Sequence, residues 1–249
     1  RVLFRSTAYE LLTAGRQLAD DLGEELCAVL VGHQVSALAD DLFAHGADVV
    51  YVCEHPALEH YLDDVYAKIL ADMVAQYKPN KFLLPATNMG RSLSAKTAVF
   101  VGTGLTADAT EVKINKEDGQ LHATRPTFGG NLMATITCAH TRPEMCSLRP
   151  MSYDKAPAVA GRKGELVSFA FNPAKHTSLA KFIEFIQSEG DGMDLSEASV
   201  IVAGGRGLGK AEGFALLKKL ADRLGGAVAA SRAPVDSGWI DYRYQIGLT

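Results

Sequence analysis

The first half of the chain alternates between stretches with helical periodicity and short apolar stretches. Leucines and alanines between Thr7 and Leu22 recur at spacings of three and four residues, which predicts an amphipathic helix. The apolar stretch "ELCAVLVG" follows, and the alternation continues with helices predicted at 35–44, 58–77 and 92–101 and strands at "ADVVYVC" and "KFLLPA". Short strand-forming segments between helices are typical of βα units, so the pattern predicts a parallel sheet with helices on both faces.

The pattern changes between Asp108 and Arg149. The segment "EVKINKEDGQLHATRP" consists of two alternating stretches around Asp118–Gly119, a dipeptide that favours a hairpin turn. The segments "NLMATITCAH" and "MCSLRP" add further strand-forming residues. We therefore expect an antiparallel addition after the parallel units.

The second half returns to the α/β alternation after a stretch of weak periodicity marked by prolines and glycines. The segment "SVIVAG" predicts a strand, the glycines that follow a turn, "KAEGFALLKKLADRLG" a helix and "GAVAASR" another strand. This order is typical of a nucleotide-binding unit. The predicted organisation is an N-terminal α/β domain at 1–155, a linker with connecting segments at 156–196, and the start of a second domain at 197–249.

Composition and charge narrow the classes of partner. The net charge of −4 gives no reason to expect nucleic acid, and no apolar stretch or leader pattern predicts membrane insertion. The four cysteines show no C-x-x-C spacing, which indicates reduced thiols in a reducing compartment, and we expect a cytoplasmic location. The scattered histidines predict no metal site. No acid/base pair or nucleophile–base set stands out, so we assign no catalytic residue and leave open whether the chain is an enzyme.

The glycine-rich turn "GGRGLGKA" departs from two phosphate-binding motifs. It matches G-x-x-x-x-G-K, but Ala211 stands where an ATP-binding loop needs a magnesium-holding hydroxyl, which disfavours an ATPase. Its glycines are spaced G-x-G-x-G, not G-x-G-x-x-G, and the next strand ends in "ASR", without the acid that binds a ribose. What remains is a general anion site, in which Arg206 adds a positive charge to backbone amides at a helix start. The alternative is that the glycines serve only a tight turn.

A second arginine follows the next strand. Ser231 and Arg232 end "GAVAASR", and ligands of parallel sheets bind beside the carboxyl ends of the strands. Arg206, Ser231 and Arg232 are therefore expected to face one anionic ligand. The segment "QIGLT" is a candidate for a third contact.

Several segments together resemble one known family. "VIVAGGRGLG", "GAVAASRAPVDSGW" and "YQIGLT" resemble the flavin-binding domain of the electron transfer flavoprotein alpha subunit. "KPNKFLLPATNMGRSLSAKTAVFVGTGLTADATEV" and "TRPTFGGNLMATI" resemble the N-terminal domain of the same family. The match covers nearly the whole chain in order. It implies an FAD-binding electron carrier in an obligate heterodimer, whose N-terminal domain packs on a smaller beta subunit.

The resemblance also implies partners and contacts. Electrons would pass from NADH or a dehydrogenase to an acceptor such as an acyl-CoA dehydrogenase or quinone reductase, and "TRPTFGGNLMATI" is similar to anaerobic bacterial members, some of which bifurcate electrons. Arg232 would lie near the isoalloxazine ring, where a positive charge stabilises reduced, anionic flavin. Leu248 stands where the family usually has Gln. The residues implied to contact FAD are Arg206, Gly207, Ser231, Arg232, Gln245, Ile246, Gly247, Leu248 and Thr249.

The resemblance further implies an additional strand before Arg1 and a continuation after Thr249, so we expect a longer natural chain with a doubly wound flavin-binding domain. Arg91 follows a predicted strand end and is a candidate for reaching an anion, with a helix cap or a pair at a subunit interface as the simpler interpretation. Arg125 and Arg149 each precede a proline and are candidates for facing the flavin or the beta subunit, with a solvated position as the simpler interpretation. The alternative function is a non-redox α/β module that binds an adenine nucleotide.

Overall fold

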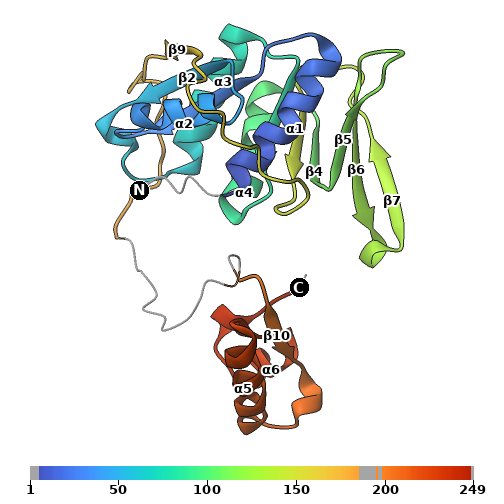
Figure 1. Ribbon diagram of the computed structural model, residues 1–249. Helices are drawn as coiled ribbons and strands as arrows, with labels where there is room; N and C mark the ends of the chain where they lie inside the picture. The colour runs from blue at the N-terminus through green and yellow to red at the C-terminus, as the bar shows by residue number, and fades with distance from the viewer. Residues whose placement is uncertain (1–5, 185–194, 196–197, 248–249) are drawn as a thin grey trace. The chain divides into compact units, whose positions relative to one another are not determined.

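The chain forms two compact units, Arg1–Ile183 and Glu184–Thr249. The computed structural model describes residues 6–184, 195 and 198–247 (Figure 1). In the described residues, no helix has both the length and the apolar content needed to cross a membrane.

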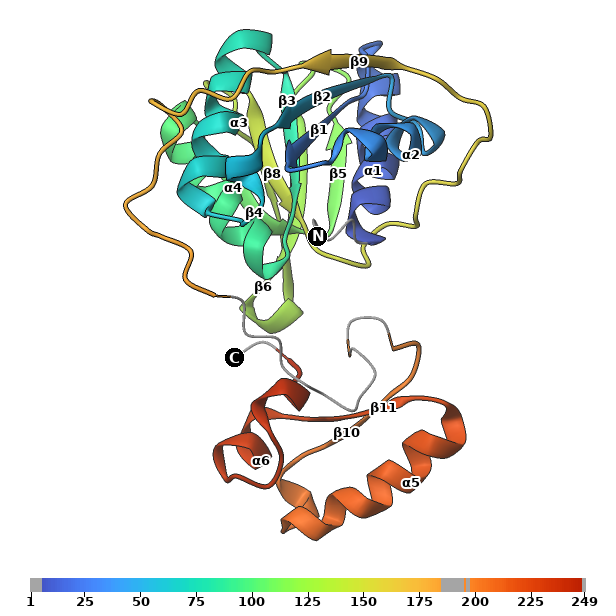
Figure 2. The ribbon, with the colours of Figure 1, turned by 90° about the vertical axis from the view of Figure 1, so that its left-hand side faces the viewer.

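Parallel strands form the centre of the first unit. They make two three-stranded sheets with the orders β1-β2-β9 and β3-β8-β4. Figure 2 shows α3 and α4 on one side of these strands and α1 and α2 on the other. The elements are β1 (Cys27–Gly32), β2 (Val49–Glu54), β3 (Lys81–Pro85), β4 (Leu105–Ala109), β8 (Glu144–Leu148), β9 (Glu165–Ser168), α1 (Ser6–Leu22), α2 (Ala39–Ala44), α3 (Asp63–Tyr77) and α4 (Asn88–Val101).

The predicted helices of the first unit are present, with three clearly shifted starts. α2 begins at Ala39 and not at residue 35, because the residues before it form a separate 3-10 turn, Ser36–Leu38. α3 begins at Asp63, because the apolar residues before it form a separate 3-10 turn, Pro56–Leu58, whose backbone is capped by the His55 side chain. α4 begins at Asn88, because Thr87 caps it by accepting a hydrogen bond from the N–H of Gly90. The start of α4 thus follows its capping residue and not the apolar periodicity.

The antiparallel addition contains three strands, β5 (Glu111–Ile114), β6 (Leu121–Thr127) and β7 (Leu132–Ile136). β5 and β6 form the expected hairpin around Asp118–Gly119, and Gly119 adopts a φ of +68° in the turn. β7 pairs with β6 at the edge of this sheet.

The expectation for "MCSLRP" was wrong. This segment forms β8, which runs parallel to both of its neighbours and lies between β3 and β4. All five of its residues are buried. Met145 packs with the cluster around α3 and α4, whereas Cys146 and Leu148 pack with the cluster that includes α1. A strand covered on both faces has no polar alternation to identify it, which is typical of parallel strands.

The chain between 156 and 183 contains a further strand of the first unit. β9 pairs in parallel with β2, and its first residue, Glu165, donates its N–H to the carbonyl of Asp48. The segment for which the sequence suggests a linker thus begins by extending the first sheet.

The second unit is a small α/β arrangement. β10 (Ile201–Gly204) and β11 (Ala227–Ala230) are parallel, and α5 (Phe214–Leu224) connects them and packs on both. α6 (Arg232–Asp236) follows β11. Gly204 ends β10 directly beneath α5: a Cβ at this position would lie 2.4 Å from Leu208 Cδ1 and 2.6 Å from Leu217 Cδ1. Only a glycine allows the strand and the helix to approach this closely.

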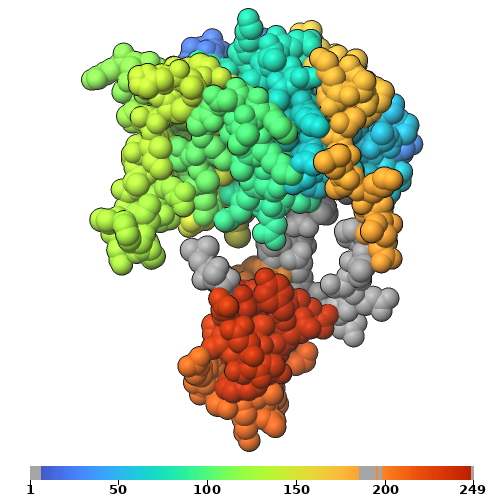
Figure 3. Space-filling model, turned by 180° about the vertical axis from the view of Figure 1, so that it is seen from behind, coloured from blue at the N-terminus to red at the C-terminus, as the bar shows by residue number. Residues whose placement is uncertain are grey.

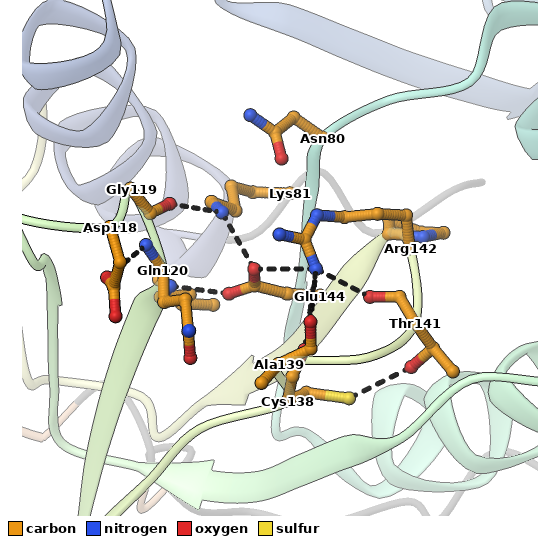
Figure 4. Close-up of polar contacts among 12 residues, drawn as sticks. Asn80, Lys81, Asp118, Gly119, Gln120, Cys138, Ala139, Thr141, Arg142 and Glu144 are labelled. Atoms are coloured by element: carbon orange, nitrogen blue, oxygen red, sulfur yellow. Dashed lines mark hydrogen bonds and ion pairs between the residues drawn. The ribbon is translucent and has the colours of Figure 1, made fainter.

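A buried ion pair connects three parts of the first unit (Figure 4). The side chain of Glu144, at the start of β8, is 1% exposed; its Oε1 lies 3.0 Å from Lys81 Nζ of β3 and 3.1 Å from Arg142 Nη1. Its Oε2 accepts the backbone N–H of Leu121 in β6. Lys81 Nζ also donates to the carbonyl of Gly119 at 2.7 Å. One carboxylate therefore joins the parallel sheet to the hairpin.

Replacing Glu144 with Ala is expected to destabilise the first unit by about 3–5 kcal/mol, because it leaves the Lys81 ammonium buried without its anion. Urea unfolding followed by near-UV circular dichroism measures this change. Glu111→Ala is the matched control, since Glu111 pairs with Lys113 on the surface, with side chains 48% and 70% exposed. An effect of Glu144→Ala no larger than that of the control would contradict the role given to the pair.

Gly204→Ala is expected to destabilise the second unit by about 1–3 kcal/mol through overpacking against Leu208 and Leu217. Gly207→Ala is the control, because a Cβ at Gly207 would meet nothing within 4 Å and its φ is not positive. Thermal unfolding of both variants compares them. Equal midpoints would show that the strand and the helix are not in close contact at Gly204.

Candidate cofactor-binding site

Two loops leave the same edge of the small sheet in the second unit. β10 and β11 are in register, with Gly204 opposite Ala230, so the residues that follow each strand lie beside one another. Ser231 donates its N–H to the carbonyl of Gly204 at 3.0 Å. A Cβ at Gly205 would lie 3.5 Å from Ser231 Oγ. The glycine turn with Arg206 and the loop with Ser231 and Arg232 thus meet at the carboxyl edge, where parallel sheets bind ligands.

A third segment joins this edge. Gln245 forms a parallel bridge with Ala230, and Ile246 donates its N–H to the Ala230 carbonyl at 2.9 Å. Gln245, Ile246 and Gly247 therefore extend past the end of β11. Leu248 and Thr249, predicted as the last contacts of this segment, lie outside the described residues. The sequence pattern indicated a contact here, but it is too short to show that the contact is a parallel bridge.

The glycine turn leaves its backbone open. A Cβ at Gly205 would approach only Ser231, and Gly207 has nothing within 4 Å of that position. The side chain of Arg206 is exposed beside them. An accessible backbone with an adjacent guanidinium suits a diphosphate, so the residues present fit a dinucleotide cofactor.

The turn differs from prediction in where the helix begins. We expected the helix to start at Lys210, directly after the glycines, but α5 begins at Phe214. Two 3-10 turns, Arg206–Leu208 and Ala211–Gly213, come first, separated by Gly209 with a φ of +76°. An anion at this edge would therefore meet the backbone of the first 3-10 turn and not the N-terminus of α5.

Ser231 and Arg232 both have polar groups available at the edge. Ser231 precedes α6, but its side chain makes no capping hydrogen bond. Arg232 Nε lies 3.1 Å from Asp236 Oδ2 one turn later, and both side chains are more than 60% exposed. Because an exposed pair of this kind contributes at most about 1 kcal/mol, it leaves the guanidinium free to bind a ligand.

Two of the predicted arginines of the first unit, Arg91 and Arg149, bind one buried aspartate, Asp108. Asp108 ends β4 near the close of β8, with a φ of +61°, and its N–H donates to Ser147 Oγ at 3.0 Å. Arg149 binds it through Nε and Nη2 at 3.2 and 2.7 Å, and Arg91 Nη2 lies 3.2 Å from the same carboxylate. The hydrogen bond from Arg149 is the main cause that lowers the pKa of Asp108, and the charges of Arg91 and Arg125 lower it further. Burial acts in the opposite direction and raises it. Arg91 and Arg149 therefore have structural partners.

Among the described residues, no group of histidine, cysteine, aspartate and glutamate side chains has the arrangement of a metal site.

Comparison with protein families finds a matching domain for each of the two units. Residues 3–174 match the electron transfer flavoprotein domain, and residues 194–249 match the electron transfer flavoprotein FAD-binding domain. FAD is thus the cofactor of the second unit's family.

Individual relatives agree with these matches. The chain is 45% identical to the electron transfer flavoprotein subunit alpha of Megasphaera elsdenii, over 98% of this chain and 73% of the relative. It is 40% identical to the acryloyl-CoA reductase electron transfer subunit beta of Anaerotignum propionicum, over 98% and 74%. It is 38% identical to a subunit of the lactate dehydrogenase (NAD(+),ferredoxin) of Acetobacterium woodii, over 97% and 57%. The chain belongs to the electron transfer flavoprotein family, as an alpha-type subunit.

Proposed function

We propose that FAD binds along the carboxyl edge of β10 and β11, held by the glycine turn, the Ser231–Arg232 loop and the segment from Gln245 onward. The observation that carries this proposal is the convergence of the three segments. The bridge between Ala230 and Gln245 and the hydrogen bond between Ser231 and Gly204 connect three segments that are separate in the sequence. The matched FAD-binding domain supports the identity of the ligand.

Each side chain at this edge has a distinct task in the proposal. FAD supplies the one- and two-electron chemistry, and the protein supplies binding and electrostatics. Arg206, exposed beside an open backbone, neutralises the diphosphate. Arg232 places positive charge near the flavin, where it favours the reduced anion. Ser231 offers an uncommitted hydroxyl for orientation.

We propose that the electrons come from NADH or a dehydrogenase and pass to an acceptor such as an acyl-CoA dehydrogenase or quinone reductase. The names of two relatives support this range, one being an electron transfer subunit of an acryloyl-CoA reductase and the other a subunit of a dehydrogenase named for both NAD(+) and ferredoxin. The second name also supports electron bifurcation. A non-redox adenine-nucleotide module has no comparable support.

The first unit carries a surface suited to a protein partner. Four large apolar side chains near β7 are exposed, by 39% to 80%: Phe128, Leu132, Met133 and Ile136. They belong to the β6–β7 hairpin, which Figure 3 shows in yellow-green at the edge of the unit. Exposed large apolar side chains concentrated in one hairpin are typical of protein interfaces. We propose that this hairpin contacts the beta subunit.

Replacing Arg206 with Ala is expected to weaken FAD binding about 10- to 100-fold, because a charge-assisted contact to the diphosphate is lost. The experiment purifies the full-length complex, records its flavin spectrum and identifies the nucleotide released on denaturation. Arg223→Ala is the control, an exposed arginine in the last turn of α5. Unchanged FAD content in Arg206→Ala would contradict the site, and release of AMP or ATP without flavin from the unaltered protein would overturn the redox function.

Replacing Leu132 and Met133 with Asp is expected to weaken association with the beta subunit at least tenfold, because charged side chains would be desolvated in the interface. Analytical ultracentrifugation of the two purified subunits measures the change. Val159→Asp is the control, since Val159 is also apolar and 54% exposed but lies outside the hairpin. Association as tight as that of the control would exclude the hairpin from the interface.

A further inference from the structure

Before the chain reaches the second unit, it runs as an irregular strap along α3. This strap comprises residues 169–184, directly after β9 (Figures 1 and 2). Phe169 donates its N–H to the carbonyl of Val52, the last backbone hydrogen bond between the strap and the sheet in the described residues. Beyond it, the strap's described backbone hydrogen bonds are local ones, between Asn172 and Thr177.

Side chains at the surface attach the strap to the rest of the unit. Lys68 of α3 donates to the carbonyl of Thr177 at 2.6 Å, and Ser178 donates to Asp64 at 3.1 Å. Phe182 stacks on His60 with ring centroids 3.7 Å apart. Apart from His176, the residues from Asn172 to Glu184 are exposed or half-buried.

His176 is the one buried side chain in this described stretch, with 1% of it exposed. Its Nδ1 accepts the N–H of Asn172 at 3.0 Å, and its Nε2 lies 3.2 Å from Asp72 Oδ2 of α3. An open cavity of about 620 Å³ lies beside the ring, lined among others by Gln76 and Phe171. Phe169 and Phe171, at the start of the strap, pack against the hydrophobic cluster that includes α3. Beyond Phe171, His176 is the one buried side chain of the strap's described residues, and it lies next to unfilled space.

The groups that receive the strap keep other partners when it leaves. Asp64 also pairs with Lys96, which binds Asp63 as well at 2.9 Å. Asp72 is 41% exposed, so water can replace His176. Undocking thus leaves no buried charge unpaired on α3, which is the condition that would make release costly.

We propose that the part of the strap beyond Phe171 is a releasable segment latched by His176, and that its release sets the length of the tether between the two units. Undocking 12 residues, 172–183, would lengthen the tether by at most about 40 Å at about 3.3 Å per residue. The consequence for electron transfer rests on the proposed function: a longer tether gives the flavin-bearing unit a wider range of acceptors. The release itself is independent of flavin.

The test is limited trypsin digestion of the full-length protein, comparing unaltered chain, His176→Ala and His176→Asn. Trypsin cleaves after Lys175 and Lys181 of the strap. Opening that exposes these bonds is local unfolding, and loss of the latch is expected to raise their cleavage rate about tenfold. His176→Asn keeps an acceptor near the Nδ1 position and is expected to restore part of the protection. His33→Ala, a half-buried histidine outside the strap, is the control.

Cleavage after Lys81, inside β3, separates local release from general unfolding. Faster cleavage in the strap with unchanged cleavage at Lys81 supports the latch. Equal rates for His176→Ala and the unaltered chain, or a rise at both places, overturn it. Amide hydrogen exchange at Asn172 is the second readout, and its protection falls with His176→Ala if the hydrogen bond to Nδ1 holds the strap.

Failure of the proposed function gives a different result. A chain that binds no FAD would contradict the cofactor site while leaving the digestion pattern as expected. If both proposals hold, His176→Ala retains its FAD and changes the rate of electron transfer to an acceptor protein. A variant with a released strap and an unaltered rate would overturn the tether role.

Discussion

The buried carboxylate of Glu144 is the interaction on which the first unit depends. Removing a carboxylate and an ammonium from water costs several kcal/mol, and only close partners offset that cost. Glu144 has them in Lys81, Arg142 and the N–H of Leu121, which come from β3, the loop before β8 and β6. Because β8 lies between β3 and β4, this anchor fixes the central strand of the β3-β8-β4 sheet. It also sets the position of the opposite end of β8, where Arg149 reaches Asp108.

The sequence predicted those structural elements that depend on a few adjacent residues. The leucine spacing of α1 and the Asp118–Gly119 turn each identify their structure from a few adjacent residues. That the turn with Arg206 and the loop with Ser231 leave the same sheet edge was predictable as well, since consecutive parallel strands place their carboxyl ends together. The direction of β8 was not, because a fully buried strand shows no alternation. The pairing of Lys81 with Glu144 spans 63 positions and depends on strand register, which no local pattern encodes.

The two units differ in how their arginine side chains are paired. In the first unit, Arg91 and Arg149 both form ion pairs with Asp108. The hydrogen bond from Arg149 lowers the pKa of that carboxyl, so Asp108 stays ionised well below neutral pH. In the second, the side chains at the strand ends are exposed, and Arg232 has only a solvated partner on its own helix. Committed charge gives a fixed framework, whereas uncommitted charge at an open glycine turn gives a place for a ligand.

That openness carries an energetic consequence. In its described residues the second unit has a two-stranded sheet with α5 packed against both strands, and such a small sheet is marginal without further packing. A ligand that binds only the folded state adds stability in proportion to the logarithm of its concentration over its Kd, about 2.7 kcal/mol at 100 times Kd. FAD bound along the three converging segments would tie the two strands to the Gln245 segment. Binding of FAD at the proposed site would therefore be coupled to the folding of this unit.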